Sequence, residues 1–527
     1  MVASQTAPTR GSARATLVVM FGIGVSRVFG LVREQVVAFY FGRSAAYSAF
    51  VAAYKVPNLV RVLLGEGNLS ASFIPVLAEG MRAGDAARTE RLARGVLGLL
   101  LATVAVLTLA GMAAAPALAW VVAPGFDPAL RELVERLIVI LFPTMAFMVV
   151  GAWCMGVLHV HGRFFWPNFA PLFWSVVSAG ALIALVGRVD MDPVYVLAWS
   201  VVAGSALQLA VQLPAVKTTL GTLAPGGGWR EPAVRKVVAL FGPMLVGTGV
   251  AQLSTLIDVQ IASFLSDQSV ATLAYAQRLY LLPLSLFGVA IAQVALPTLS
   301  HDAARSGERI LAELGTAWRR MAFLMLPSAL ALAAFGRPAV SLLFERGRFD
   351  ADDSTAVTWV LAAYAIGLLA YGAVRLFATA FYAVQDTRTP VRVAVGALVV
   401  NAALGIGLAL LLGTPGIALA TAVAAIANAT ALGAILRRRL GRVFAGSTGR
   451  DTLRMVAAAL AVGAVATLPY LWILACWPGW GLHERLPAAA GLYAGIGVAY
   501  LVVARVFGVD ELRGVRDRLA SRGSGKR

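Results

Sequence analysis

Residues 16–42 read TLVVMFGIGVSRVFGLVREQVVAFYFG, an apolar run long enough to cross a lipid bilayer as one helix. Arg27, Arg33 and Glu34 lie inside this run. A charged side chain in hydrocarbon costs at least about 2.5–3.5 kcal/mol on insertion scales, so such residues normally face a wet cavity, a partner or a substrate. The stretch therefore predicts a membrane helix that forms one wall of a cavity, and its arginines favour an anionic cargo.

The composition of the whole chain is that of a membrane protein. Of 527 residues 59% are hydrophobic and only 13% are charged, and the mean hydropathy is +0.80. A soluble protein has about 25% charged residues. The polar start of the chain, followed by an apolar run too long for a signal sequence, predicts no cleavable signal peptide. Cys154 and Cys476 both fall in apolar runs, which predicts packing rather than a disulfide framework or thiol catalysis.

Length and apolarity predict an all-α, polytopic membrane protein with about fourteen transmembrane helices. The predicted spans lie near 16–42, 44–64, 95–122, 133–156, 164–187, 193–216, 237–264, 268–299, 321–336, 355–384, 393–412, 415–436, 455–476 and 486–504. The span at 44–64 is the weakest, because Lys55, Pro57, Asn58 and Arg61 interrupt it. The ninth span is short as drawn and is expected to begin several residues earlier.

The distribution of positive charge predicts the orientation. With a cytoplasmic N-terminus, thirty of the 44 Lys and Arg residues fall in cytoplasmic segments and eight in outer segments. This is a strong positive-inside pattern with both termini cytoplasmic. The net charge of +18 is therefore interpreted as attraction to anionic lipid headgroups, not to nucleic acid.

The sequence contains a weak internal repeat with an offset of 225 residues. GIGVSRVFGLVREQVVAFY, from Gly22, aligns with GTGVAQLSTLIDVQIASFL, from Gly247, and Arg33 then lies opposite Asp258. Six spans separate the copies, so both have the same orientation, as in transporters with a central site between two lobes. We expect two pseudo-symmetric six-helix lobes, at 1–220 and 221–440, and two additional spans with a basic cytoplasmic tail at 441–527.

Basic residues predominate among the intramembrane charges, which are Arg27, Arg33, Glu34, Lys55, Arg61, Asp258, Arg278 and Arg375. Pairing between helices is the alternative for any one of them. Such pairing explains the eight residues together less well, because the basic ones outnumber the acidic ones and cannot all be paired. Arginine is also the residue suited to bidentate contact with phosphate. The set predicts a cavity for an anionic, phosphate-bearing cargo.

Several stretches, in order along most of the chain, resemble the MurJ (MviN) family of lipid II flippases. They are SRVFGLVRE at 26–34, AFVAAYKVPNLVRVLLGEG at 49–67, SASFIPVLAE at 70–79, HGRFFWPNFAP at 161–171, LAYAQRLYLLPLSLFGVAIAQVALPTLS at 273–300, LFERGRFD at 343–350 and FYAVQDTRTPVRVA at 381–394. The resemblance implies a member of the multidrug/oligosaccharidyl-lipid/polysaccharide exporter superfamily. Such a protein moves the undecaprenyl-diphosphate-linked peptidoglycan precursor to the outer leaflet of the plasma (inner) membrane of a bacterium, and its last two spans add a groove for the lipid tail.

The resemblance implies roles for particular residues. The substrate-binding arginines would be Arg27, Arg33, Arg61 and Arg278. The gating or supporting residues would be Glu34, Ser48, Lys55, Asn58, Glu66 and Arg375. Together they imply a diphosphate-binding cluster with gating carboxylates. Lipid II and membrane lipids are the implied partners, and proteins of cell-wall synthesis or division are further candidates.

Three positions depart from the family pattern. Ser48 and Gln277 stand where the family often has aspartate, which puts a salt-bridge gate in doubt. Asp258, Asn401 and Thr421 fall where some relatives coordinate sodium, the only cofactor that the resemblance suggests. Gly405 replaces a carboxylate of that site and weakens the suggestion.

Two alternatives remain open at this point. An exporter of a drug or of another polyprenyl-linked saccharide would share the fold, but an exporter of cationic drugs would have an acidic cavity. A membrane-embedded enzyme acting on polyprenyl-diphosphate lipids would need paired carboxylates or histidines at a membrane face, and the sequence has no such motif. His159 and His161 alone make a poor metal site. No phosphate-binding loop of the GxxxxGK[ST] type is present, which predicts transport without ATP hydrolysis.

Overall fold

The computed structural model describes residues 10–65, 67–228, 231–303, 307–441 and 447–509, and the secondary structure in these ranges is helical. The described chain divides into two compact units. Unit 1 contains residues up to Ala271 together with Arg346–Phe349, and unit 2 contains Thr272–Glu345 and the chain from Asp350 onward. The long apolar runs of the sequence thus became helices, as predicted.

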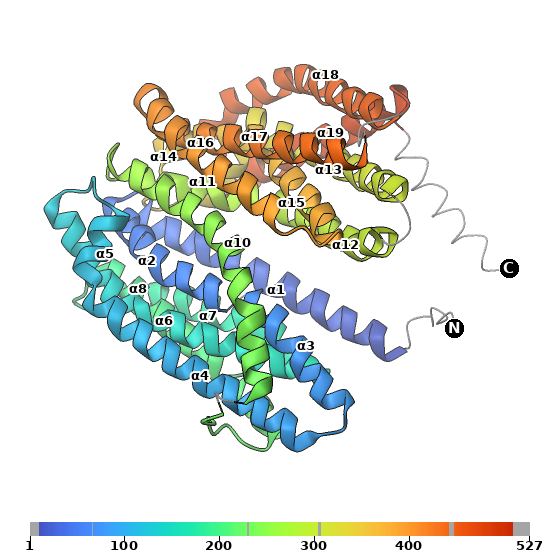
Figure 1. Cartoon of the computed structure of the whole chain (residues 1–527). Coiled ribbons are helices and arrows are strands. Elements are labelled where there is room, and N and C mark those ends of the chain that lie inside the picture. Colours follow the sequence, from blue (N-terminus) through green and yellow to red (C-terminus); the bar gives the residue numbers. More distant parts are fainter. Residues whose placement is uncertain (1–9, 66, 229–230, 304–306, 442–446, 510–527) are drawn as a thin grey trace. The chain divides into compact units, whose positions relative to one another are not determined.

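Unit 1 is built from ten helices in the described chain and the start of an eleventh. Their bounds are α1 Arg10–Phe41, α2 Ala45–Leu64, α3 Asn68–Arg82, α4 Ala86–Ala113, α5 Ala115–Val122, α6 Pro128–Val160, α7 Phe165–Leu185, α8 Pro193–Ala210, α9 Leu213–Leu220 and α10 Pro232–Ser263. Helix α6 is central and contacts α2, α3, α4, α5 and α8. Figure 1 shows α4 and α6 running side by side.

Local sequence explains where these helices begin. Asp127 precedes α6, and its carboxylate accepts a hydrogen bond from the Leu130 N–H at 2.7 Å. Asp192 does the same for Val194 at the start of α8, at 3.0 Å. In both cases a proline occupies the first turn, where its missing N–H would have had no intrahelical partner. An aspartate followed by a proline therefore defines the start of both α6 and α8.

Unit 2 contains the rest of the helices. Their bounds are α11 Ser269–Pro283, which starts in unit 1, η1 Leu284–Val289, α12 Ala290–Ala303, α13 Gly307–Phe344, α14 Ala351–Ile366, α15 Leu368–Ala383, α16 Arg388–Leu412, α17 Thr414–Leu440, α18 Ser447–Cys476, η2 Trp477–Gly479 and α19 Leu482–Val506. Helix α13 contacts α12, α14, α15, α18 and α19. It begins well before the ninth predicted span, as expected.

Two spans of unit 2 are interrupted by irregular turns. Helices α14 and α15 meet at an angle of 40° beside Gly367, where a Cβ atom would approach the backbone of Ala422 to 2.8 Å. The chain between α11 and α12 forms the π-helix η1 immediately after Pro283. Proline removes a backbone donor, and π-turns often accompany such interruptions in functional helices. The span of α14 and α15 is therefore bent, whereas the span from Ser269 to Leu296 is continuous and contains a π-helical turn.

The described residues contain ten helices long and apolar enough to cross a membrane, or eleven if α14 and α15 form one span. This matches the predicted polytopic all-α fold, while the count of fourteen stays a prediction. The two units divide at Ala271, after α10, whereas the repeat divides the sequence at 220. The lobes at 1–220 and 221–440, with the additional spans at 441–527, therefore also stay a prediction.

Candidate functional site

Arg33 is the most constrained of the predicted cargo-binding residues in unit 1. Its guanidinium forms an ion pair with the carboxylate of the adjacent Glu34. It also lies over the ring of Trp174 on α7, with the guanidinium carbon 4.0 Å from the ring centroid. The Arg33 side chain is only 15% exposed. Stacking and pairing together hold the planar fork of this arginine in one orientation on α1.

Arg27 lies two turns earlier on α1 and is exposed. In the described part of the chain it makes no hydrogen bond or ion pair. Its neighbour Ser26 donates to the backbone carbonyl of Asn168 at 3.1 Å, which fixes this turn of α1 against α7. Helical spacing places Arg27 and Glu34 on one face, but the structure pairs Glu34 with Arg33 instead. Arg27 therefore keeps its charge available to an anion.

Helix α2 presents a second basic position. The Asn58 side-chain oxygen accepts two hydrogen bonds from Arg61, from Nε at 3.1 Å and from Nη2 at 2.9 Å. Asn58 thus positions Arg61, while the supporting role that the resemblance implied for Asn58 stays a prediction. Lys55, one turn earlier, is half-buried. Glu66 lies outside the described residues.

Ser48 anchors the start of another helix. It is fully buried, and its hydroxyl accepts a hydrogen bond from the Ala271 N–H in the first turn of α11 at 3.1 Å. The first turn of an α-helix has N–H groups without intrahelical partners, and a side-chain oxygen that satisfies one of them acts as a cap. A neutral hydroxyl therefore caps α11 from α2, at the position where the family often has aspartate.

In unit 2, Arg278 and Arg375 are the predicted basic residues. Arg278 on α11 is half-buried, and its guanidinium carbon lies 5.8 Å from the ring centroid of Tyr275, one turn earlier. Arg375 on α15 is exposed. Both lie within apolar helices, as predicted. Their position relative to the basic residues of unit 1 stays a prediction.

The residues suggested for sodium are divided between the units. Asp258 is buried in unit 1, on α10, whereas Asn401 and Thr421 lie in unit 2, on the adjoining helices α16 and α17. The Thr421 hydroxyl donates to the Ile417 carbonyl of its own helix at 3.0 Å. Among the residues that the structure describes, no three His, Cys, Asp or Glu side chains are grouped to hold a metal ion. Sodium binding therefore stays a prediction.

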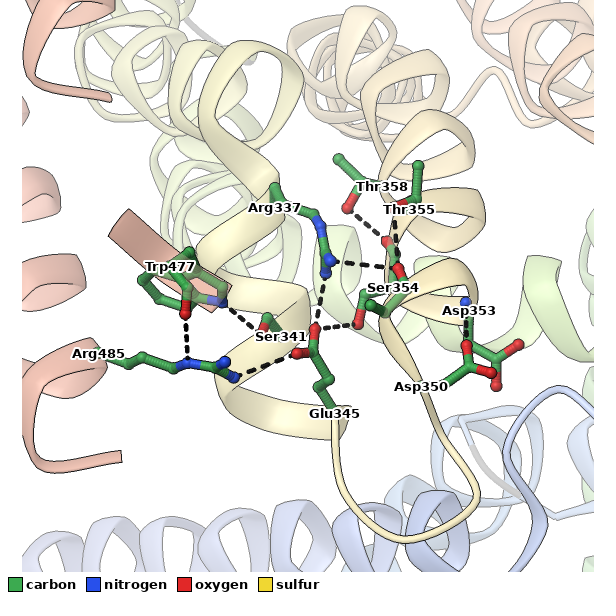
Figure 2. Close-up of polar contacts among 11 residues, drawn as sticks. Arg337, Ser341, Glu345, Asp350, Asp353, Ser354, Thr355, Thr358, Trp477 and Arg485 are labelled. Carbon is green, nitrogen blue, oxygen red and sulfur yellow. Dashed lines mark hydrogen bonds and ion pairs between the residues drawn. The ribbon is translucent and has the colours of Figure 1, made fainter. Parts of the chain in front are cut away.

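Glu345, at the end of α13, is the centre of a polar network that sequence reasoning did not assign (Figure 2). One carboxylate oxygen accepts from Arg337 and from Ser354, both at 2.9 Å, and the other accepts from Arg485 at 3.1 Å. The Glu345 side chain is 14% exposed. The network joins the end of α13 to the start of α14 and to α19, one of the two additional helices.

The surroundings of Glu345 stabilise its ionised form. Partial burial raises the pKa of its carboxyl, but hydrogen bonds from Ser341, Ser354 and Arg337 outweigh burial and leave the pKa below its ordinary value. Arg485 is itself held, because its Nε donates to the Trp477 carbonyl at 3.2 Å. The Trp477 ring N–H in turn donates to Ser341 at 2.9 Å. Figure 2 shows these side chains converging from separate segments of the chain.

The segment Arg346–Phe349 follows Glu345 directly and belongs to unit 1. The Arg348 N–H donates to the carbonyl of Phe39, near the end of α1, at 2.9 Å. Gly347 has a positive φ of 60°, and a Cβ atom there would lie 2.4 Å from the Phe39 carbonyl oxygen. Only glycine fits this close approach without a shift of the backbone.

Sequence comparison places the chain among known proteins. The profile of the family described as lipid II flippase MurJ matches residues 37–490, which extend over both units. The probable lipid II flippase MurJ of Vibrio cholerae is 35% identical over 501 residues, covering 92% of this chain and 94% of that relative. The lipid II flippase MurJ of Burkholderia cenocepacia is 37% identical over 395 residues, covering 74% of this chain and 76% of that relative.

Solved structures share the fold. A lipid II flippase MurJ in an inward closed conformation matches with a TM-score of 0.76 at 23% identity, covering 94% of this chain and 100% of that chain. An inward-facing multidrug resistance transporter of the MATE family and MOP superfamily matches with a TM-score of 0.66 at 15% identity, covering 82% of this chain and 99% of that chain. At these identities the likeness is one of architecture.

Proposed function

This chain belongs to the lipid II flippase MurJ family, and from that membership we propose that it moves lipid II from the cytoplasmic to the outer leaflet of the bacterial inner membrane. The described residues contain ten or eleven helices long and apolar enough to cross a membrane, which supports a multi-pass membrane protein. Relatives over 30% identical across most of their length carry the flippase name, and this sequence likeness is the observation on which the proposal rests.

The proposed cargo contact is a diphosphate clamp formed by Arg27, Arg33, Arg61 and Arg278. Arg33 supports this role best, because Glu34 and Trp174 hold its guanidinium in a fixed orientation. A planar fork that is already oriented loses little conformational entropy when it binds two phosphate oxygens. Arg61 is also oriented, because its guanidinium donates two hydrogen bonds to the Asn58 side chain. Pre-organised arginines would favour a diphosphate over a single negative charge.

We propose alternating access with both chain termini in the cytoplasm. The positive-inside pattern supports this orientation. The empty basic cavity would be disfavoured by repulsion between its arginines, and the anionic cargo would relieve that repulsion. The polarity of the intramembrane charges argues against a cationic drug as cargo, since such a cargo would need acidic partners.

The proposal is tested by growth of cells depleted of their own lipid II flippase. We expect the unaltered chain to restore growth and Arg27→Ala, Arg33→Ala and Arg278→Ala to abolish it while the proteins still insert. Arg188→Ala, at an exposed loop, is the matched control and should restore growth fully. Normal growth with two of the three cavity variants would refute the diphosphate clamp. Failure of the unaltered, correctly inserted chain would refute the flippase assignment.

A further inference from the structure

Unit 2 contains a large apolar groove outside the predicted cargo cluster. It has a volume of about 1100 Å³, slightly above the roughly 300–1,000 Å³ typical of ligand sites. Small residues of two facing helices form its floor: Ala370 and Ala373 on α15, and Ala429, Gly433 and Ala434 on α17. Ala370 and Ala373 are three residues apart, and Ala429 is four and five residues before Gly433 and Ala434, so each set forms a stripe on one face of its helix. These small side chains leave space between the two helices for a ligand.

The walls of this groove are held in place. Trp318 of α13 stacks on Phe377 of α15, with ring centroids 5.7 Å apart, and its ring N–H donates to Thr452 of α18 at 3.0 Å. The only hydroxyl in the lining belongs to Thr430, and it donates to the Ile426 carbonyl of its own helix at 2.9 Å. The polar atoms of the wall are thus satisfied internally, which leaves an apolar surface suited to a hydrocarbon chain.

One end of the groove is strongly basic. Arg437 and Arg438, in the last turn of α17, complete its lining, and both are exposed. In the described part of the chain neither forms an ion pair. The next residue, Arg439, does so with Asp386, from Nη1 to Oδ2 at 2.6 Å. Hydrogen bonds from Thr389 and Arg439 lower the pKa of Asp386 to about 2, so this carboxylate stays ionised and occupied by its own partners. The charge of Arg437 and Arg438 therefore remains available to a ligand.

We propose that this groove binds an anionic glycerophospholipid of the bilayer, with an acyl chain along the stripes of α15 and α17 and the headgroup phosphate between Arg437 and Arg438. Basic pockets between membrane helices bind such headgroups, and the apolar surface supplies the hydrophobic contact. The proposed orientation places the basic end at the cytoplasmic leaflet. Lipid binding itself does not depend on that orientation or on flippase activity.

The groove differs from the face of α15 that carries Arg375, one of the predicted gating or supporting residues. Arg375 is two residues from Ala373 and two from Phe377, which line the groove. Two residues on an α-helix are about 200° apart, so Arg375 lies on the opposite side of α15. A phospholipid in the groove would therefore not contact the face of α15 that carries Arg375. The two binding events can be separated by mutation.

The test measures how many phosphatidylglycerol molecules remain on the full chain after it is extracted from nanodiscs into detergent, by native mass spectrometry. We expect retention by the unaltered chain. Removing both headgroup contacts in Arg437→Gln/Arg438→Gln should weaken binding roughly thirtyfold, equivalent to about 2 kcal/mol at about 1 kcal/mol per arginine. Arg392→Gln/Arg450→Gln changes two exposed arginines outside the groove and should leave retention unchanged.

A second variant separates groove binding from surface charge. Ala434→Trp fills the groove from an exposed position and keeps both arginines, so we expect it to lose the lipid as well. Ile426→Trp, also at an exposed wall position, replaces it if Ala434→Trp lowers the melting temperature. If these folded variants still retain phosphatidylglycerol, the lipid is held by surface charge alone and the proposal is overturned. So would displacement of phosphatidylglycerol by undecaprenyl diphosphate with the same dependence on Arg437 and Arg438, because that would assign the groove to the cargo tail.

Discussion

At the residue scale, the proposed anion contact of Arg33 rests on two neighbours that hold its guanidinium. The Glu34 carboxylate partly neutralises the positive charge of Arg33, and the flat face of the Arg33 guanidinium stacks on the Trp174 ring. The sequence predicted the charges, because they interrupt an apolar run. It did not predict Trp174 as the partner, since the contact depends on how α1 packs against α7. Adjacent residues on a helix do not face each other, so the pair with Glu34 was also missed.

Arg33→Lys is the most informative substitution at this site. Lysine keeps the positive charge but loses the planar fork and the stacking on Trp174, a contact worth about 0.5–2 kcal/mol. We expect growth complementation intermediate between the unaltered chain and Arg33→Ala at equal membrane abundance. Trp174→Leu should reduce activity in the same direction, and the two changes should not be additive. Additive losses in the double variant would show that Arg33 and Trp174 act independently.

Glu345→Gln should destabilise the protein by about 3 kcal/mol, because removing the carboxylate leaves the charges of its arginine partners uncompensated.

The low pKa of the Glu345 carboxyl in the folded protein also makes stability depend on pH. The ordinary pKa is 4.5, so the stabilisation by Glu345 is complete above that pH and is lost as the pH falls through the lower folded value. Thermal unfolding in detergent between neutral and acidic pH measures this. Glu345→Gln should show a smaller loss on acidification, and an equal loss in both proteins would contradict the assignment.

At the element scale, two contacts fix the positions of helix ends. Ser48 on α2 caps the first turn of α11, and the Phe39 carbonyl on α1 accepts from the segment Arg346–Phe349. Neither contact follows from hydropathy, because each joins residues far apart in the sequence through one backbone atom. The family motif LFERGRFD drew attention to this segment without giving its partner.

Ser48→Ala should lower the free energy of unfolding by about 1 kcal/mol, the usual cost of losing a side-chain cap. Ser48→Asp should keep the hydrogen bond and add a favourable charge at the start of α11. In detergent, the melting temperature of Ser48→Asp should therefore equal or exceed that of the unaltered chain, and Ser48→Ala should have the lowest melting temperature of the three. If Ser48→Ala melts with the unaltered chain, the hydroxyl does not cap α11.

Gly347→Ala should cost several times more than Gly162→Ala. Both glycines have positive φ, so both substitutions pay about 1–2 kcal/mol for a left-handed conformation. Only Gly347 also meets the Phe39 backbone, whereas a Cβ atom at Gly162 has open space around it. Melting temperature measures the difference. Equal shifts in the two variants would mean that the Gly347 segment moves away from Phe39 at no cost.

At the scale of the whole molecule, the sequence predicted the fold class well and the irregular turns poorly. All fourteen predicted spans fall on helices, since apolar runs of about twenty residues have few alternatives in a membrane. The bend at Gly367 was missed because it depends on packing against Ala422. The network around Glu345 was missed because its arginines were counted only as loop charges. Residue identity predicted which side chains carry charge, and packing determined which of them meet.

Transport is expected to respond to the membrane potential. Moving one negative charge outward across an inside-negative membrane gains about 2.3 kcal/mol per 100 mV, and no nucleotide-binding motif suggests another energy source. Delivery of lipid II to the outer leaflet should therefore fall when the potential is collapsed at constant ATP. Unchanged delivery, with the potential verified as absent, would reject potential-driven transport and favour ion coupling or passive exchange.

The most direct test of lipid II transport by an arginine clamp measures lipid II in the outer leaflet of cells depleted of their own flippase. A lipid II-degrading enzyme added from outside reports the accessible fraction. We expect the unaltered chain and Arg188→Ala to restore degradation, and Arg27→Ala/Arg33→Ala/Arg278→Ala to leave lipid II protected at equal membrane abundance. Protected lipid II in cells with the unaltered chain, or full degradation with the triple variant, would contradict the central claim.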